Sequence, residues 1–120
     1  MITTKPELDW IVLDGWYRNK LVGFDQVRGL FRARLNGETM FIGRAAAQDS
    51  SLKSRLDAYR RRYGTGRNHY AGQMIYDHRA EIVMGIAVLD LPAFEINRLA
   101  EDLIEKHQPP WNMSTDRFRS

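Results

Sequence analysis

Two stretches in which apolar and polar residues alternate lie on either side of Asn36-Gly37. Alternation with a period of two is typical of strands with one buried face, and Asn-Gly is a preferred pair for the tightest hairpin turns. The pattern therefore predicts strands over 28–35 and 38–43, joined as a β-hairpin. The preceding stretch, up to Gln26, is rich in apolar and aromatic residues. We expect it to form a short strand or turn that packs across the core.

Residues 51–63 predict a helix, because apolar side chains recur every three or four positions from Leu52 to Tyr63. Arg55 lies three residues after Leu52 and four before Tyr59, so we expect it on the inward-facing side of this helix. A buried arginine is costly unless it meets a carboxylate or a phosphate, which makes Arg55 a candidate phosphate ligand. The alternative is a structural arginine that reaches solvent or pairs with an acid of the core.

The second half of the chain predicts two more helices and one buried strand. A helical stretch follows the glycine-rich break at 64–66 and ends near Asp77. Residues 81–89 form a nearly continuous apolar run, as in a central strand that is buried on both faces. Pro92 then starts a helix that runs to about residue 106. The order β-β-α-α-β-α predicts a small α+β domain, with a three-stranded mixed β-sheet flanked by helices.

Composition places the chain among ordinary globular domains. Of its 120 residues, 43% are hydrophobic and 28% are charged, and the absence of cysteine excludes disulfides and cysteine-ligated zinc. No apolar run approaches the roughly 20 residues of a membrane span, and the first residues do not resemble a secretory signal. We therefore expect a single domain over residues 1–120, in a bacterial or phage cytoplasm and with no membrane partner.

Positive charge is concentrated in the middle of the chain. The net charge is +3, but residues 44–70 carry seven basic side chains against two acidic ones, whereas residues 71–120 carry five against eight. Such a basic block is typical of a face that binds phosphates, and it is also found on the solvated side of a helix. The candidate nucleic-acid-binding residues are Arg44, Lys53, Arg60, Arg61 and Arg67.

Four short motifs follow one another along the chain. They are Gly29-Leu30-Phe31, Phe41-Ile42-Gly43, Arg55 within Leu-Lys-Ser-Arg-Leu, and Leu103-Ile104 followed by Pro109-Pro110-Trp111-Asn112. Their order resembles the GIY-YIG nuclease superfamily, whose members cut nucleic acid phosphodiesters. The resemblance covers about residues 28–112, with residues 1–27 as an N-terminal extension. It implies a metal-dependent endonuclease domain acting on DNA, and it leaves single- and double-stranded DNA open.

The resemblance also implies roles for individual residues. Arg55 takes the place of the arginine that contacts the scissile phosphate, and Arg44 that of a basic residue at a neighbouring phosphate. Asn112 takes the place of an asparagine that supports the site by hydrogen bonding. Phe31 and Phe41 occupy the catalytic positions of two tyrosines that orient or deprotonate the attacking water, so both hydroxyls are missing.

For these roles, Phe31 and Phe41 must lie on the same face of the hairpin. A two-residue turn would place them on opposite faces, whereas a three-residue loop with a bulge at Gly37 would place them together. We expect the second arrangement, because the resemblance requires it.

His69 is the candidate for the base that the missing tyrosines would have supplied. An imidazole titrates near neutral pH, and Tyr70 beside it offers a hydroxyl. The alternative is that His69 packs or caps locally. His78 and His107 are expected to be structural, because one lies in a turn and the other at a helix end.

The position implied for the metal-binding glutamate holds alanine. In the superfamily this glutamate stands three residues before the Leu-Ile pair and nine before the first proline, and both counts lead to Ala100. Glu101 is one residue further, a rotation of about 100° around the helix axis, and is expected to face solvent. The implied cofactor is Mg²⁺ or Mn²⁺ when glutamate stands at position 100, and with Ala100 we expect no bound cation.

Two explanations for Ala100 remain open. It is either a native core residue of a protein that binds nucleic acid without cutting it, or a replacement that inactivates a nuclease. At the level of function, the endonuclease has two rivals. One is a non-catalytic nucleic-acid-binding module on the same fold, and the other is a protein-interaction domain that docks through Glu101, Asp102 and Glu105.

Overall fold

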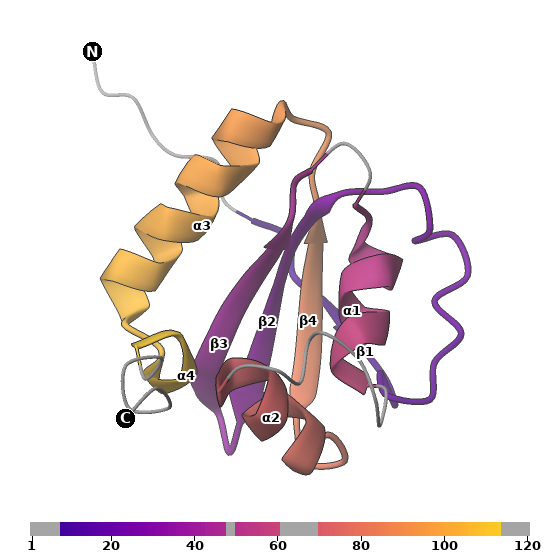
Figure 1. The fold of residues 1–120 in the computed structure, drawn as a ribbon, viewed down its shortest axis with the longest axis vertical. Helices are drawn as coiled ribbons and strands as arrows, with labels where there is room; N and C mark the ends of the chain where they lie inside the picture. The colour runs from indigo at the N-terminus through magenta and orange to yellow at the C-terminus, as the bar shows by residue number, and fades with distance from the viewer. Residues whose placement is uncertain (1–7, 48–49, 61–69, 114–120) are drawn as a thin grey trace.

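The computed structural model describes residues 8–47, 50–60 and 70–113. The described elements are, in chain order, β1 (Ile11–Leu13), β2 (Gly29–Leu35), β3 (Glu38–Ala45), α1 (Leu52–Arg60), α2 (Tyr70–Asp77), β4 (Val83–Val88), α3 (Ala93–His107) and α4 (Pro110–Met113). The strands form one sheet in the order β1-β4-β2-β3, and every adjacent pair is antiparallel (Figure 1). None of the described helices is long and apolar enough to cross a membrane.

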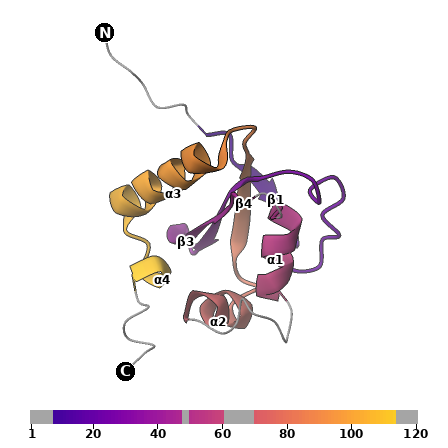
Figure 2. The same ribbon diagram turned by 45° about the horizontal axis from the view of Figure 1, so that its top comes forward.

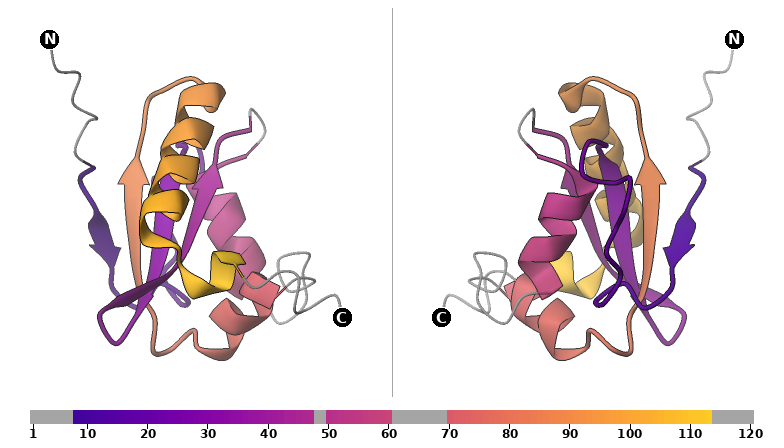
Figure 3. Two further views of the ribbon diagram at one scale, coloured as in Figure 1. Left: turned by 90° about the vertical axis from the view of Figure 1, so that its left-hand side faces the viewer. Right: turned by 90° about the vertical axis from the view of Figure 1, so that its right-hand side faces the viewer.

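Helices cover both faces of this sheet, so the domain has three layers (Figures 2 and 3). Phe31 and alternate residues along β2 point to one face, where α1, α2 and α4 close the larger core. Leu30 points to the other face and packs with Ala87, Ile96 and Ala100 beneath α3. Because side chains alternate along a strand, one strand supplies both cores.

The predicted α+β class is confirmed, but the sheet differs from the prediction in two respects. Ile11–Leu13 pairs with β4 as a fourth strand, which is too short to be recognised by its periodicity. The sheet is also antiparallel rather than mixed. β4 runs in the same direction as β3, but β2 lies between them, so no parallel pair forms.

The hairpin turn contains two residues, not the three that we expected. Asn36 and Gly37 have φ angles of 53° and 80°, and Leu35 pairs directly with Glu38 across the turn. Positive φ at both central residues is what the type I′ turn requires, and Asn-Gly adopts it at low cost. The turn alone would therefore send Phe31 and Phe41 to opposite faces.

A β-bulge next to the turn reverses that outcome. Arg34 pairs with Thr39 and Ala33 with Phe41, so Met40 is an extra residue on β3. An extra residue shifts the alternation by one position and turns the following side chains to the other face. The Phe31 and Phe41 ring centroids consequently lie 6.0 Å apart. The prediction of a shared face is confirmed, whereas the predicted position of the bulge, at Gly37, is wrong.

The glycines of the two motifs allow close contacts that a side chain would prevent. The Phe31 ring lies over Gly43, and a Cβ added there would come within 2.1 Å of the ring. A Cβ at Gly29 would come within 1.9 Å of the carbonyl oxygen of Ala87 on β4. The missing side chain at Gly43 thus leaves the space that the Phe31 ring occupies, and the missing side chain at Gly29 allows β2 and β4 to lie close together.

We predict that Gly43→Ala lowers the free energy of unfolding by about 1–3 kcal/mol, because the fully buried Phe31 ring must move to admit a methyl group. Urea denaturation of the purified protein measures the loss. The double variant Gly43→Ala/Phe31→Ala is the control, and its loss should be smaller than the sum of the two single losses. Strictly additive losses would show that the ring does not depend on Gly43.

Candidate functional site

A cavity of about 270 Å³ lies at the C-terminal end of the edge strand β3, between α1 and α3. Arg44 extends into it from β3, on the side of the sheet that α3 covers. Arg55 extends into it from α1, which covers the other face of the sheet. The remaining lining residues are Ala46, Ala47 and Ser50 of the following segment and Ala93 and Asn97 of α3. Two guanidinium groups are thereby brought to one opening, where an anion would be bound favourably.

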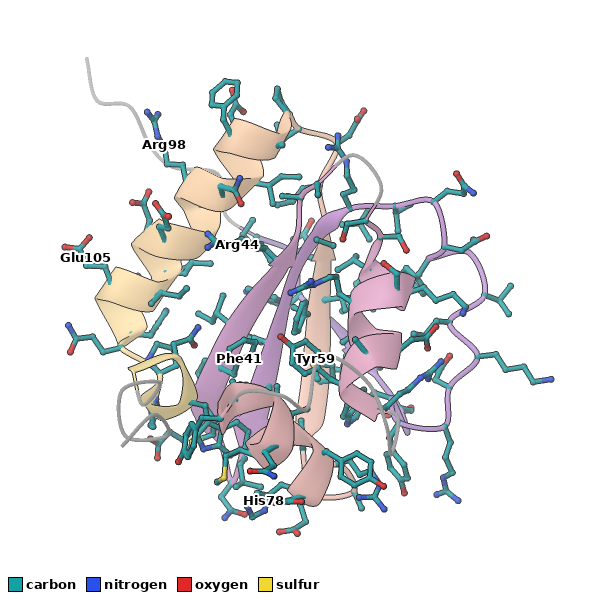
Figure 4. The ribbon with its side chains drawn as sticks, viewed as in Figure 1. Phe41, Arg44, Tyr59, His78, Arg98 and Glu105 are labelled. Atoms are coloured by element: carbon teal, nitrogen blue, oxygen red, sulfur yellow. The ribbon has the colours of Figure 1, made fainter. Side chains whose placement is uncertain are left out.

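Arg44 extends from the edge strand toward α3 (Figure 4). Its Nη1 donates a hydrogen bond of 3.3 Å to the carbonyl oxygen of Asn97 and lies 3.8 Å from Oε1 of Glu101. Glu101 was expected to face solvent. It is exposed, but it also approaches Arg44, because Asn97 and Glu101 are four residues apart and lie on the same side of the helix.

Arg55 is exposed, which corrects the expectation that it lies on the inward side of its helix. The buried stripe of α1 includes Leu52, Leu56 and Tyr59. Arg55 lies three residues after Leu52 and is therefore rotated about 60° from it, at the border of this stripe. This border faces the cavity, so the guanidinium is both anchored near the core and accessible.

Arg28 holds the two segments that form the walls of the cavity. Its Nη1 donates to the carbonyl oxygen of Ala46 at 3.0 Å, and its Nη2 donates to that of Leu91 at 3.1 Å. One carbonyl follows β3 and the other precedes α3. Arg28 therefore fixes the end of the edge strand relative to the start of the helix.

The N-terminal end of α3 adds a further positive contribution to the cavity. Ala93, which lines the cavity, is the first residue of α3, and no side chain caps this end of the helix. The backbone dipoles of a helix sum to a partial positive charge at its N-terminus. The dipole and the two arginines therefore favour the same kind of ligand, an anion.

Phe31 and Phe41 form an aromatic cluster with Tyr59, which projects from α1 over the sheet (Figure 4). Its ring centroid is 5.6 Å from that of Phe31 and 5.9 Å from that of Phe41. All three rings are buried. Tyr59 was expected only as a core residue of its helix. Its spacing of four residues from Arg55 was the signal that could have identified it.

The hydroxyl of Tyr59 lies within hydrogen-bonding reach of the Arg55 guanidinium. Burial raises the pKa of Tyr59, whereas the charge of Arg55 and this hydrogen bond lower it less strongly, so the net direction is upward. Tyr59 is therefore a neutral phenol near neutral pH. It can accept a hydrogen bond from Arg55 and so position it.

Asn112 bonds to the exposed edge of the second motif. Its Oδ1 accepts a hydrogen bond of 2.9 Å from the N–H of Ile42, and its Nδ2 donates one of 3.0 Å to the carbonyl oxygen of Ile42. The side chain thus pairs with β3 as a neighbouring strand would. These two bonds hold α4 against β3 at Ile42. The C-terminal end of β3, beyond Ile42, stays accessible and borders the cavity.

Lys53 and Arg60, two of the candidate phosphate ligands, pair with an acid of their own helix. Lys53 Nζ lies 2.8 Å from Oδ2 of Asp57, and Arg60 Nε lies 2.8 Å from its Oδ1. Arg60 also donates to the carbonyl oxygens of Trp16 and Asn19 and is largely buried. This network joins α1 to the segment after β1, so we do not keep Arg60 among the proposed phosphate ligands.

The remaining candidates are distributed differently from the expectation. His69, Arg61 and Arg67 lie outside the described residues. Tyr70 begins α2, where it is half-buried and packs against the larger core. It does not line the cavity between Arg44 and Arg55.

Ala100 is fully buried against the sheet rather than exposed to the cavity. It packs with Leu30, Ala46, Ala87 and Ile96, whereas the side chains that α3 contributes to the cavity are Ala93 and Asn97. Among residues 8–47, 50–60 and 70–113, no acidic side chain lines the cavity, and no three or more potential metal ligands (His, Cys, Asp or Glu) form a cluster. The described residues therefore do not fit a divalent cation, which prefers several oxygen ligands.

No protein-family model matches this chain, and no curated protein matches it. Among solved structures, the chain is similar to the GIY-YIG N-terminal endonuclease domain of UvrC from Thermotoga maritima, with a TM-score of 0.58 and 23% sequence identity. The match covers 81% of this chain and 94% of that chain. That structure is of a Tyr→Phe point mutant bound to the catalytic divalent cation. The likeness shows that the two chains share a fold.

We predict that the Asp57 carboxylate makes the protein sensitive to acid. Burial acts to raise the pKa of Asp57, but the hydrogen bonds and charges of Lys53 and Arg60 outweigh it, so the pKa lies below its ordinary value. A lowered pKa in the folded state stabilises the protein above the unfolded-state pKa of about 3.9, and this stabilisation is lost as the pH falls through the folded-state pKa.

Asp57→Asn should lower the free energy of unfolding by about 1–3 kcal/mol at neutral pH and reduce its decrease between about pH 5 and pH 2. Urea denaturation at several pH values measures both effects. Asp90→Asn, at an exposed position, is the control and should change neither. Equal effects of the two substitutions would contradict the assignment to the Asp57 network.

Proposed function

We propose, from the premise that the chain has the fold of a GIY-YIG endonuclease domain, that it binds the phosphate backbone of DNA in the cavity between Arg44 and Arg55. The observation that carries the proposal is the meeting of two arginines, from β3 and α1, at an opening whose described lining residues include no acid. The N-terminal end of α3 supports the same ligand.

Within this site, Arg55 contacts the phosphate that the resemblance assigns to it, the one that would carry the scissile bond. Its planar guanidinium offers paired donors to two phosphate oxygens, and the buried hydroxyl of Tyr59 keeps it in place. Tyr59 is thus a positioning residue. Arg44, held by the carbonyl of Asn97, contacts a neighbouring phosphate.

Hydrolysis of the bound phosphodiester needs a further set of groups. An attacking water must be activated, and the charge that develops on the phosphoryl oxygens must be stabilised. The similar UvrC domain structure contains a catalytic divalent cation. In this chain, Phe31 and Phe41 carry no hydroxyl, and Ala100 carries no carboxylate. We therefore propose a domain that holds DNA without cutting it, with position 100 as the vacated place of the metal ligand.

One observation favours a second candidate, a metal-dependent endonuclease. The carboxylate of Glu101 lies 3.8 Å from Arg44, at the margin of the cavity, and is mostly exposed. If Glu101 turned away from Arg44, its carboxylate could approach a cation beside a phosphate bound at Arg44. Cutting that requires Mg²⁺ or Mn²⁺ and is lost in Glu101→Gln would identify this function.

Phe94 supports single-stranded DNA as the substrate. This side chain is 64% exposed in the first turn of α3, next to Ala93 at the cavity. An exposed aromatic ring beside a phosphate site offers a stacking surface to an unpaired base, which a duplex does not present. Phe94→Ala should therefore weaken binding to single-stranded DNA more than binding to duplex DNA.

We predict that Arg55→Gln weakens DNA binding about tenfold or more, because a charge-assisted contact to phosphate is removed. The slope of log K against log salt concentration should also fall by about one. Fluorescence anisotropy with labelled single-stranded and duplex DNA measures both quantities. Arg98→Gln removes the same charge from an exposed position of α3 outside the cavity and is the matched control. Equal losses from both substitutions would mean that only overall charge matters.

We further predict that Ala100→Glu does not by itself give the protein Mg²⁺- or Mn²⁺-dependent cleavage of DNA, measured on gels with and without metal, because Phe31 and Phe41 still supply no hydroxyl to activate water. Ala100→Gln, of nearly equal size but uncharged, is the matched control and should not cut. Because Ala100 is fully buried, circular dichroism and urea denaturation should first establish that both variants fold. Asn97→Asp provides a second route, since it introduces a carboxylate directly at the cavity without a change in size. Metal-dependent cleavage by a folded carboxylate variant would contradict this prediction and show that only the metal ligand is missing.

A further inference from the structure

A second opening, of about 460 Å³, lies at the other end of β3, between the hairpin turn and the C-terminal end of α3. Two arginines of β2, Arg32 and Arg34, line it together with His107 of α3. The other lining residues are Gly37, Glu38, Thr39, Gln108 and Pro110. This opening lies on the α3 side of the sheet, away from the aromatic cluster.

The strand geometry places the two arginines beside each other. Arg32 and Arg34 are two residues apart on β2 and therefore point to the same face. Arg32 lies over the ring of Trp10, 4.5 Å from the ring centroid, and Arg34 donates a hydrogen bond of 2.6 Å to the carbonyl oxygen of Gly37. Burial, followed by the positive charge of Arg34, lowers the pKa of Arg32.

This pair of positive charges is not balanced within the described part of the chain. Neither arginine forms an ion pair there, and the acid in the lining, Glu38, is exposed. The Nε–H of each arginine is shielded from solvent and has no acceptor among the described residues. The fold thus places two neighbouring guanidinium groups at one opening without a carboxylate partner among the described residues, and an anion bound in the opening would offset their mutual repulsion.

We propose that this opening is a second phosphate-binding subsite, which takes a backbone phosphate of the same DNA that occupies the cavity between Arg44 and Arg55. The inference rests on the proposed function. α3 connects the two openings, since Asn97 lines one and His107 the other. Ten residues of helix span about 15 Å, which corresponds to about four or five nucleotides along one strand of a duplex.

The test compares DNA of two lengths. On an oligonucleotide long enough to span both openings, Arg32→Gln/Arg34→Gln should weaken binding at least about tenfold and lower the salt slope by about two. On an oligonucleotide of about three nucleotides, which reaches only one opening, the same variant should bind like the unmodified protein. Arg34→Gln alone should show a smaller loss in the same direction and covers the case in which the double variant does not fold. Arg98→Gln is again the charge-matched control.

Three results would overturn the subsite. Equal losses on both lengths would indicate a general charge effect. No loss on the long DNA, while Arg55→Gln still weakens binding, would remove the subsite and leave the proposed function intact. The absence of DNA binding by the unmodified protein would remove the proposed function and, with it, this inference. In that last case, titration with inorganic phosphate, followed by the arginine Nε–H resonances in NMR spectra, would show whether the opening binds free phosphate instead.

Discussion

The extra residue at Met40 is the constraint on which the rest of the structure depends. Because it shifts the alternation of β3 by one position, Phe41 and Gly43 point to the face of α1, and Ile42 and Arg44 point to the face of α3. Without the bulge, Arg44 would enter the core and Phe41 would leave it. Both the aromatic cluster and the cavity with two arginines follow from this single irregularity.

The edge position of β3 explains why the two arginines of the proposed site can meet at its end. An edge strand has one unpaired side, and in this domain the Asn112 side chain pairs with it at Ile42. At its C-terminal end, the edge is accessible from both faces, so that α1 and α3 can each contribute to one opening. Arg28 fixes this arrangement through backbone carbonyls, which any sequence would supply. The shape of the site thus depends mainly on hydrogen bonds to the backbone and on few contacts between side chains.

Three of the positions to which the resemblance assigns chemistry contribute to packing in this chain. Phe31, Phe41 and Ala100 are all buried, and each lies in one of the two cores. The phenol of Tyr59 belongs to the same aromatic cluster, but burial raises its pKa further above neutrality, which disfavours a role as a base. Two arginines meet at one opening, whereas the described residues around it include no group placed to activate water. This difference is why we propose binding of DNA rather than its cleavage.

Local patterns in the sequence determined the hairpin, the helices from Leu52 and from Pro92, the buried strand near residue 85 and the basic character of the middle of the chain. These features depend on propensity, periodicity and turn chemistry, which act between residues close in sequence. The pairing of Ile11–Leu13 with β4 and the hydrogen bonds from Arg60 to the carbonyl oxygens of Trp16 and Asn19 depend on contacts between distant segments. No local pattern encodes them. The tertiary structure alone therefore decided which arginines line a cavity and which form hydrogen bonds within the protein. The physical reason is that a guanidinium group can bind an external anion or an internal carboxylate or carbonyl, depending on which groups the fold brings next to it.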